Sequence, residues 1–236
     1  KSGFKECFSK QHYWGESEFK RPNIFDVSNF RKGAKLFDQG IFFKNELTEE
    51  NIGLTIDPEK LTLSNRQWLQ IEKDVNQDTS IYVDVDGLKQ EMDQWTFPLH
   101  FIDFETSGAA LPFNKGLKPY EQIAFQFSHH IYHKDGRIEH ANEYINNKPG
   151  FFPNFEFLRA LKRALENDKG TILRYSSHEN TILNAIYVQL MSSNEVDKDK
   201  LITFIKDISH SKKDSTIKWK GPRDMVDLWD VEKKYY

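Results

Sequence analysis

The hydrophobic pattern changes character along the chain. Residues 1 to about 95 show no sustained period, whereas the pattern is regular from about residue 97. The stretch LHFIDFET, residues 99–106, has apolar residues at both odd and even positions, so they would lie on both faces of a strand. This pattern is typical of a central strand that is covered on both faces. Two further apolar stretches, 120–133 and 138–145, flank an Asp135-Gly136 turn. This arrangement predicts a β-hairpin after the first strand.

Helical periods follow the hairpin. Residues 154–168 place five apolar side chains on one face of an amphipathic helix, and residues 178–191 repeat such a stripe. The apolar stretch 171–177 between them predicts a fourth strand. The order strand, strand, strand, helix, strand, helix predicts an α/β fold with a mixed sheet flanked by helices.

Composition limits the classes of protein that fit. The chain has 236 residues, 38% of them hydrophobic and 29% charged, which is typical of a globular protein. No apolar run approaches the roughly 20 residues of a membrane span, and no secretory signal is visible, so we expect a cytoplasmic protein without a membrane partner. Cys7 is the single cysteine, which excludes an intrachain disulfide. Because the net charge is only −3, a surface that binds nucleic acid has to be local.

Two carboxylates stand together at the end of the first strand. Asp103 and Glu105 are separated by one residue, so both point to the same side of a strand. Carboxylates this close repel each other unless one is protonated or a cation bridges them, and Mg²⁺ prefers such oxygen ligands. Taken alone, the pair fits a solvated strand end or a helix cap better than a metal site.

A third acidic residue, Glu179, lies in the first turn of the helix predicted over 178–191. It follows the fourth strand and is placed to face Asp103 and Glu105. A structural role explains the same spacing, because Ser176-x-x-Glu179 fits a capping box in which Glu179 bonds a backbone amide. The spacing leaves both interpretations open.

A resemblance to a known family favours the first interpretation. The segments HFIDFETSGAALPFNKGLKPYEQIAFQFSHH and YSSHENTIL, together with DMVDLWDVEKKYY, resemble the DUF2779 family over roughly residues 95–236. Members of this family are similar to DEDD 3′–5′ exonucleases and are expected to have a ribonuclease H-like fold. The resemblance implies a domain over residues 96–236, preceded by an irregular extension over residues 1–95.

The resemblance also implies a site. Asp103 and Glu105 match the first exonuclease motif, and Glu179 falls at the carboxylate of the second, so these three are the expected catalytic and metal-binding residues, with Mg²⁺ or Mn²⁺ as cofactor. The pattern needs a fourth carboxylate. Asp227 is a weak candidate, since the resemblance makes it structural, and we expect the fourth carboxylate beyond Tyr236 in an incomplete domain.

Several residues are expected to bind substrate. Aromatic side chains can stack on the terminal base of a strand, and lysines between residues 206 and 223 can contact phosphates, although core packing and a solvated loop explain these residues better. The expected substrate-binding residues are Phe104, Tyr120, His130, Lys218 and Lys220.

Two other kinds of metal site find little support in the sequence. The segment KECFSKQHYW resembles the junction to an upstream nuclease region with an iron–sulfur site, but a cluster needs about four cysteines, so we expect none in this chain. His129 and His133, or His130 and His140 across the hairpin, can share a face, yet no cysteine or tight histidine motif supports zinc.

The resulting expectation is metal-dependent 3′–5′ exonuclease hydrolysis of phosphodiester bonds in DNA or RNA, with a single-stranded 3′ end as partner. One alternative is a catalytically inactive nucleic-acid-binding module of the same fold. Another is a protein-interaction domain in which the carboxylates are caps and surface charges.

Overall fold

The computed structural model describes residues 3–57 and 61–236. The chain divides into two compact units whose boundary lies between Val83 and Asp84. Residues 84–95 therefore fold with the sheet. Within the described part of the chain, no helix combines the length and the apolar character that crossing a bilayer requires.

The unit before Val83 is built from short helices. They are α1 (Gly3–Gln11), α2 (Gly33–Asp38), α3 (Glu49–Ile52) and α4 (Leu63–Val75), with 3₁₀ turns at Glu18–Lys20, Ile24–Asp26 and Lys44–Glu46. One small apolar cluster surrounds Ile24 and Ile71, and an aromatic one joins Phe8, Trp14 and Phe43. Because α1, α2 and α3 contain nine residues or fewer, this part of the sequence shows no sustained period.

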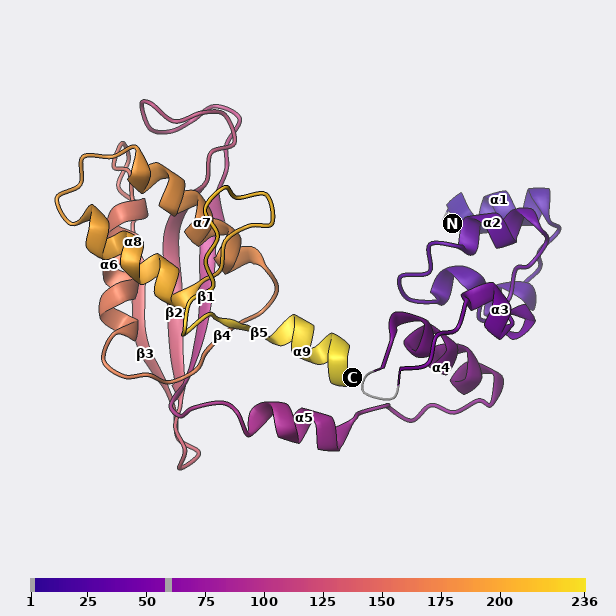
Figure 1. Cartoon of the computed structure of the whole chain (residues 1–236). Helices are drawn as coiled ribbons and strands as arrows, with labels where there is room; N and C mark the ends of the chain where they lie inside the picture. The colour runs from indigo at the N-terminus through magenta and orange to yellow at the C-terminus, as the bar shows by residue number, and fades with distance from the viewer. Residues whose placement is uncertain (1–2, 58–60) are drawn as a thin grey trace. The chain divides into compact units, whose positions relative to one another are not determined.

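The second unit contains a five-stranded mixed sheet (Figure 1). Its strands are β1 (Leu99–Ser107), β2 (Ile123–Tyr132), β3 (Ile138–Ile145), β4 (Ile172–Arg174) and β5 (Val226–Asp227). Their order is β3-β2-β1-β4-β5. β2 runs antiparallel to β1 and β3, whereas β4 runs parallel to β1 and β5. The predicted hairpin, the mixed sheet and the central position of the first strand are confirmed.

Three helices pack on one face of the sheet. They are α6 (Asn154–Leu165), α7 (His178–Met191) and α8 (Lys198–Ile208). Ile102, Phe104 and Phe127 from the sheet join their buried side chains in one core. The predicted stripes of α6 and α7 are confirmed: the buried side chains are Phe157, Leu158, Leu161, Ala164 and Leu165 on α6, and Ile182, Leu183, Ile186 and Leu190 on α7.

The opposite face is exposed over β1, β2 and β3. In β1, His100, Ile102 and Phe104 are buried whereas Phe101, Asp103 and Glu105 are exposed, so the expectation of burial on both faces was wrong for this strand. The strand register aligns the exposed and half-buried side chains of this face in rows. We call this surface the open face; its rows are Phe101–His130–His140, Asp103–Ser128–Glu143 and Glu105–Gln126–Ile145.

A short helix lies at each end of the second unit. α5 (Val85–Met92) precedes the sheet and α9 (Leu228–Tyr235) follows it. The Asp84 backbone N–H donates to the Tyr235 carbonyl at 2.8 Å, and the Tyr235 hydroxyl donates to Glu91 at 2.9 Å. These contacts hold α5 against α9.

Candidate functional site

The carboxyl end of β1 presents the first two acidic residues. Asp103 and Glu105 both lie exposed on the open face, as their spacing predicts. A β-bulge follows Glu105, where the register with β2 shifts between Glu105 and Thr106. Bulges bend a strand and redirect its side chains, and they are over-represented next to active sites.

The start of α7 brings the third acidic residue to the same end of β1. Thr106 Oγ1 and His178 Nε2 lie 3.2 Å apart and connect the strand end to the helix. The next residue, Glu179, is only 2% exposed. The cap of α7 is Ser177, and its side chain makes no capping hydrogen bond. The capping box over Ser176 and Glu179 is thus absent.

Glu179 is a buried carboxyl with an unsatisfied oxygen. Its Oε2 is buried and has no hydrogen-bond partner. The pKa of Glu179 is raised to about 7, chiefly by burial and to a smaller extent by the negative charge of Asp103, whereas hydrogen bonds from backbone N–H groups and the Arg174 guanidinium oppose the shift. Asp103 is therefore close enough to Glu179 for their charges to interact, and a buried carboxyl with one unpaired oxygen marks a candidate site.

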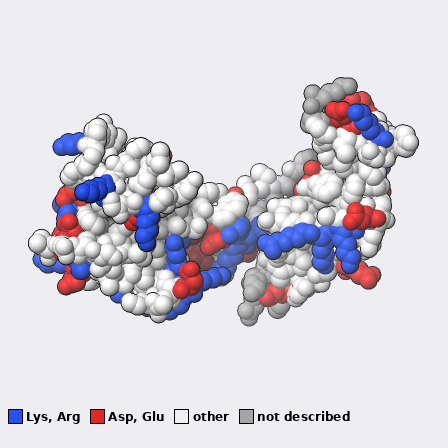
Figure 2. All heavy atoms as spheres, turned by 90° about the horizontal axis from the view of Figure 1, so that it is seen from above, with Lys and Arg blue, Asp and Glu red and all other residues white. Residues whose placement is uncertain are grey.

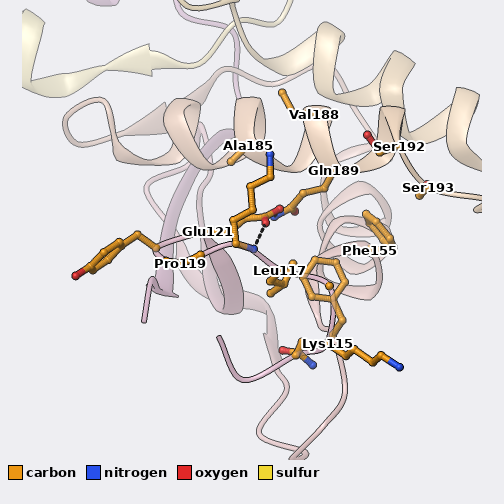
Figure 3. Close-up of a pocket in the computed structure, with 15 residues that line it drawn as sticks. Lys115, Leu117, Pro119, Glu121, Phe155, Ala185, Val188, Gln189, Ser192 and Ser193 are labelled. Carbon is orange, nitrogen blue, oxygen red and sulfur yellow. Dashed lines mark hydrogen bonds between the residues drawn. The ribbon is translucent and has the colours of Figure 1, made fainter. Parts of the chain in front are cut away.

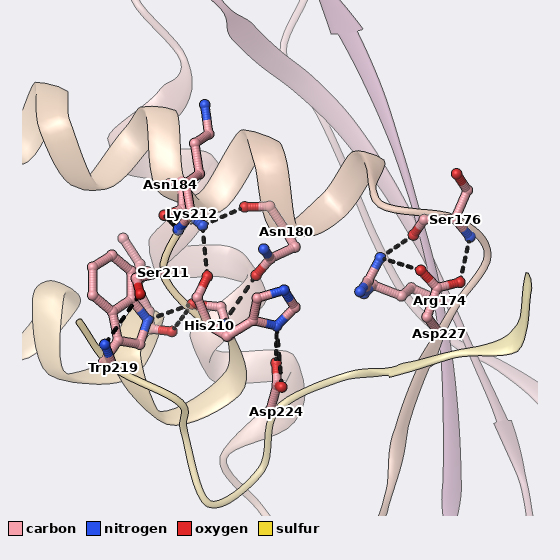
Figure 4. Close-up of polar contacts among 12 residues, drawn as sticks. Arg174, Ser176, Asn180, Asn184, His210, Ser211, Lys212, Trp219, Asp224 and Asp227 are labelled. Atoms are coloured by element: carbon pink, nitrogen blue, oxygen red, sulfur yellow. Dashed lines mark hydrogen bonds and ion pairs between the residues drawn. The ribbon is translucent and has the colours of Figure 1, made fainter. Parts of the chain in front are cut away.

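A salt-bridge network supports the segment before α7. The Arg174 Nη1 atom lies 2.9 Å from Asp227 Oδ2 in a buried pair (Figure 4). Asp227 Oδ1 also accepts hydrogen bonds from the backbone N–H groups of Ser176 at 2.8 Å and Trp229 at 3.0 Å. Both Asp227 oxygens are thus occupied by protein groups. This arrangement gives Asp227 a structural role in joining β4, β5 and the turn into α7.

The chemistry of these residues fits Mg²⁺ or Mn²⁺. Within residues 3–57 and 61–236, no three His, Cys, Asp or Glu side chains are grouped so as to hold a metal ion among themselves. Mg²⁺ needs fewer protein ligands, because it keeps several waters and usually binds one or two carboxylates plus substrate phosphates. Asp103 offers an exposed carboxylate and Glu179 an unpaired oxygen. These two residues therefore fit the ion, with Glu105 adjacent on the open face.

Phe104 is a correction among the expected substrate contacts. It is 3% exposed and packs edge-on against Phe157 at 4.9 Å between ring centroids. The alternation that places Asp103 and Glu105 on the open face sends Phe104 into the core between sheet and helices. No face of its ring is free to stack on a base.

Tyr120 lies in the loop between β1 and β2 and is 68% exposed. It lines a cavity of about 730 Å³ together with Lys115, Phe155 and Gln189, between this loop and helices α6 and α7 (Figure 3). Its backbone has a left-handed φ of 61°, a strained conformation for a tyrosine. The exposed ring is available to a ligand.

The remaining three expected contacts lie in three different places. His130 lies on the open face, where its Nε2 is 3.1 Å from His140 Nδ1. Lys218 donates to the backbone carbonyls of Lys212 and Lys213, so its ammonium is bound to its own loop. Lys220 lines a separate cavity of about 510 Å³ that also contains Arg174.

On the face of the sheet unit that Figure 2 shows, cationic side chains form no single patch. On the face of the sheet unit visible in Figure 2, Lys and Arg lie interspersed with Asp and Glu. This distribution agrees with the small net charge of −3. Any contact with phosphates is therefore local.

Arg174 was missed by the sequence interpretation. It is the last residue of the apolar strand β4 and is 4% exposed. Its positive charge lowers the pKa of Glu179 and so opposes the effect of burial. A charged residue at the end of an apolar strand was the feature that singled out Asp103, and the same feature applies to Arg174.

Comparison with known proteins places the chain in one family. No curated protein and no solved structure matches it. The model of a protein family described as "Domain of unknown function (DUF2779)" matches residues 100–236, a range that includes the acidic residues and all five strands except the first residue of β1. The match covers more than half of the sequence, and the chain therefore belongs to the DUF2779 family.

Proposed function

We propose that the sheet unit is a metal-dependent nuclease domain of ribonuclease H-like architecture that hydrolyses phosphodiester bonds at 3′ ends of DNA or RNA. The observation that carries this proposal is the buried Glu179 carboxyl, whose Oε2 is unpaired beside the charge of Asp103. Leaving a buried carboxyl unsatisfied costs free energy, and a divalent cation removes that cost. The mixed sheet, with its acidic pair on the central strand, supports the finer fold assignment.

Each side chain of the proposed site has its own role. Asp103 and Glu179 would hold the ion, and Glu105, at the same exposed strand end, would orient the attacking water. Mg²⁺ or Mn²⁺, when bound, supplies Lewis-acid activation of water and stabilises charge on the phosphate oxygens. His178, linked to Thr106, is the imidazole next to Glu179 and is placed to accept a proton at the rim of the site.

An apolar cavity beside the acidic pair fits the base of a terminal nucleotide. Its volume is about 500 Å³, and its walls include Ser107, Phe113, Ile145 and Phe151. Ile145 lies in the same row as Glu105, two strands away, which is about 10 Å at the usual strand spacing. Phe113 and Phe151 are exposed and free to stack on an unpaired base.

Two measurements test the proposal. The first is thermal unfolding with increasing Mg²⁺ or Mn²⁺: an ion that binds only the folded state raises the unfolding temperature by mass action. The second is degradation of a 3′-labelled oligonucleotide by the wild type and by Asp103→Asn. We expect metal-dependent shortening from the 3′ end in the wild type and none in the variant. Equal degradation by both proteins would contradict the proposal.

The second candidate function is a nucleic-acid-binding module without catalysis. It is favoured by Asp227, the weak candidate for the fourth carboxylate, because both of its oxygens are bound by protein groups. In that case the wild type binds single strands and is stabilised by the ion, yet leaves the labelled oligonucleotide intact. If the protein binds neither the ion nor single-stranded nucleic acid, the result would support a protein-interaction domain instead.

A further inference from the structure

Two histidines face each other across the hairpin on the open face. His130 of β2 and His140 of β3 are direct partners in the strand register. His140 Nδ1 and His130 Nε2 lie 3.1 Å apart, with ring centroids 4.7 Å apart. Two nitrogens bound at about 2.0–2.1 Å in a tetrahedral zinc site lie about 3.3 Å from each other. The separation therefore already matches the edge of a coordination tetrahedron.

A carboxylate orients one of the two rings. His140 Nε2 lies 2.8 Å from Glu143 Oε2, and since a carboxylate accepts, His140 donates from Nε2 and carries its lone pair on Nδ1. Histidines that ligate metals usually donate their other ring nitrogen to a carboxylate in this way, which fixes the tautomer and strengthens the ligand. Without an ion, this nitrogen accepts a hydrogen bond from His130 Nε2. When the His130 proton is carried on Nδ1 instead, both facing nitrogens present lone pairs to a cation.

The surroundings leave room for an ion and its waters. Both rings are exposed, and the side chain of His140 is 45% exposed. The row Phe101–His130–His140 adjoins the row of Asp103, so the pair shares the open face with the acidic residues. Imidazole nitrogens prefer zinc, copper and nickel, whereas carboxylates prefer magnesium and manganese.

We propose that His130 and His140, oriented by Glu143, form a second metal site on the open face that takes a divalent transition ion of the zinc, nickel and copper class. The site supplies two protein ligands, and waters complete the shell. It differs from the acidic site in ligand type and in preferred ion. Its existence does not depend on nuclease activity.

The test is calorimetric titration of the full chain, without an affinity tag, with Ni²⁺ alone. We expect His130→Ala and His140→Ala each to weaken the strongest Ni²⁺ binding more than tenfold. Glu143→Gln weakens it about tenfold, the usual effect of losing a carboxylate behind a ligating histidine. His133→Ala, in the turn of the same hairpin, is the matched control and leaves binding unchanged.

Cu²⁺ electron paramagnetic resonance gives a readout that a general loss of structure does not imitate. The wild type should show coupling to two imidazole nitrogens, and each single variant, checked for wild-type thermal unfolding, should show one. His130→Gln serves as a second variant if His130→Ala unfolds. Binding within twofold of wild type in the His140 variant, or equal loss in His133→Ala, overturns the proposal. Retention of Mn²⁺ stabilisation in His130→Ala separates this site from the acidic one.

Discussion

His100 Nδ1 and His129 Nε2 lie 2.9 Å apart on the helix-covered side of the sheet, where these residues are 1% and 0% exposed. His100 Nε2 lies 2.8 Å from Asp168, so a chain of hydrogen bonds leads from the interior to a partly exposed carboxylate. Burial, and then the proximity of His100, lowers the pKa of His129 to about 4. His129 is therefore neutral in the folded protein at neutral pH.

This depressed pKa makes stability depend on pH. The unfolded chain, with an ordinary histidine pKa near 6.5, binds a proton before the folded chain does. The contribution of His129 to the free energy of unfolding is thus present above about pH 6.5 and is lost as the pH falls toward 4. We expect the stability difference between wild type and His129→Gln, measured by urea unfolding, to shrink by about 2–3 kcal/mol between pH 7.5 and 4.5. A difference that stays constant over this range would contradict the assignment.

The contribution of Glu179 to stability should depend on pH in the opposite direction to that of His129. Its folded pKa is raised to about 7, so the folded state binds the proton more tightly and stability falls as the pH rises from about 4.5 to 7. We expect Glu179→Gln to be more stable than wild type at pH 8, by up to about 3 kcal/mol, and this gain to vanish near pH 4.5. Millimolar Mg²⁺ should stabilise the wild type at pH 8 and leave the variant unchanged. Urea unfolding with and without the ion measures both effects.

The Arg174–Asp227 pair should be important for stability and dispensable for chemistry. Removing one partner of a buried ion pair leaves an uncompensated charge, and Asp227→Asn should cost about 3 kcal/mol or more. Because both Asp227 oxygens are bound by protein groups, the rate per folded molecule on a labelled oligonucleotide should remain within about threefold of wild type. Abolished cleavage in a variant that is still folded would instead make Asp227 the fourth metal ligand.

Phe104 and Tyr120 should give contrasting variants. Phe104→Ala opens a cavity in the core and should cost about 3–5 kcal/mol of stability. Tyr120→Gly removes an exposed ring at a left-handed position, where glycine is unstrained, so stability should change by less than about 1 kcal/mol. We expect the Tyr120 variant to bind a single-stranded oligonucleotide more weakly, by about 1–3 kcal/mol if the ring stacks on a base. Fluorescence anisotropy measures this affinity, with Tyr13→Gly as the control, since Tyr13 is also exposed with a left-handed φ of 58°.

The regular elements were predictable because their determinants are local. The two apolar stretches on either side of the Asp135-Gly136 turn specify the hairpin. The apolar stripe that contains Phe157 and Leu161 specifies α6. The burial of Phe104 was predictable too, since a residue between Asp103 and Glu105 must point to the other face of the strand.

Other features depend on packing between distant segments. The apolar residues of β1 do not reveal that its open face lacks a covering layer. The burial of Glu179 follows from the docking of α7 against β1, and a capping box has the same spacing. Exposure of Phe101 and burial of Glu179 are thus tertiary properties that no local pattern encodes.

The contact between Asp84 and Tyr235 has a practical consequence. Asp84 and Tyr235 are far apart in the sequence, yet their backbones are joined by a hydrogen bond of 2.8 Å. Fluorescent labels at these two positions should therefore lie close together in the folded protein and separate when α9 detaches from α5. An exposed turn such as the one at Gly136 is a place where a tag can be inserted without disturbing this contact.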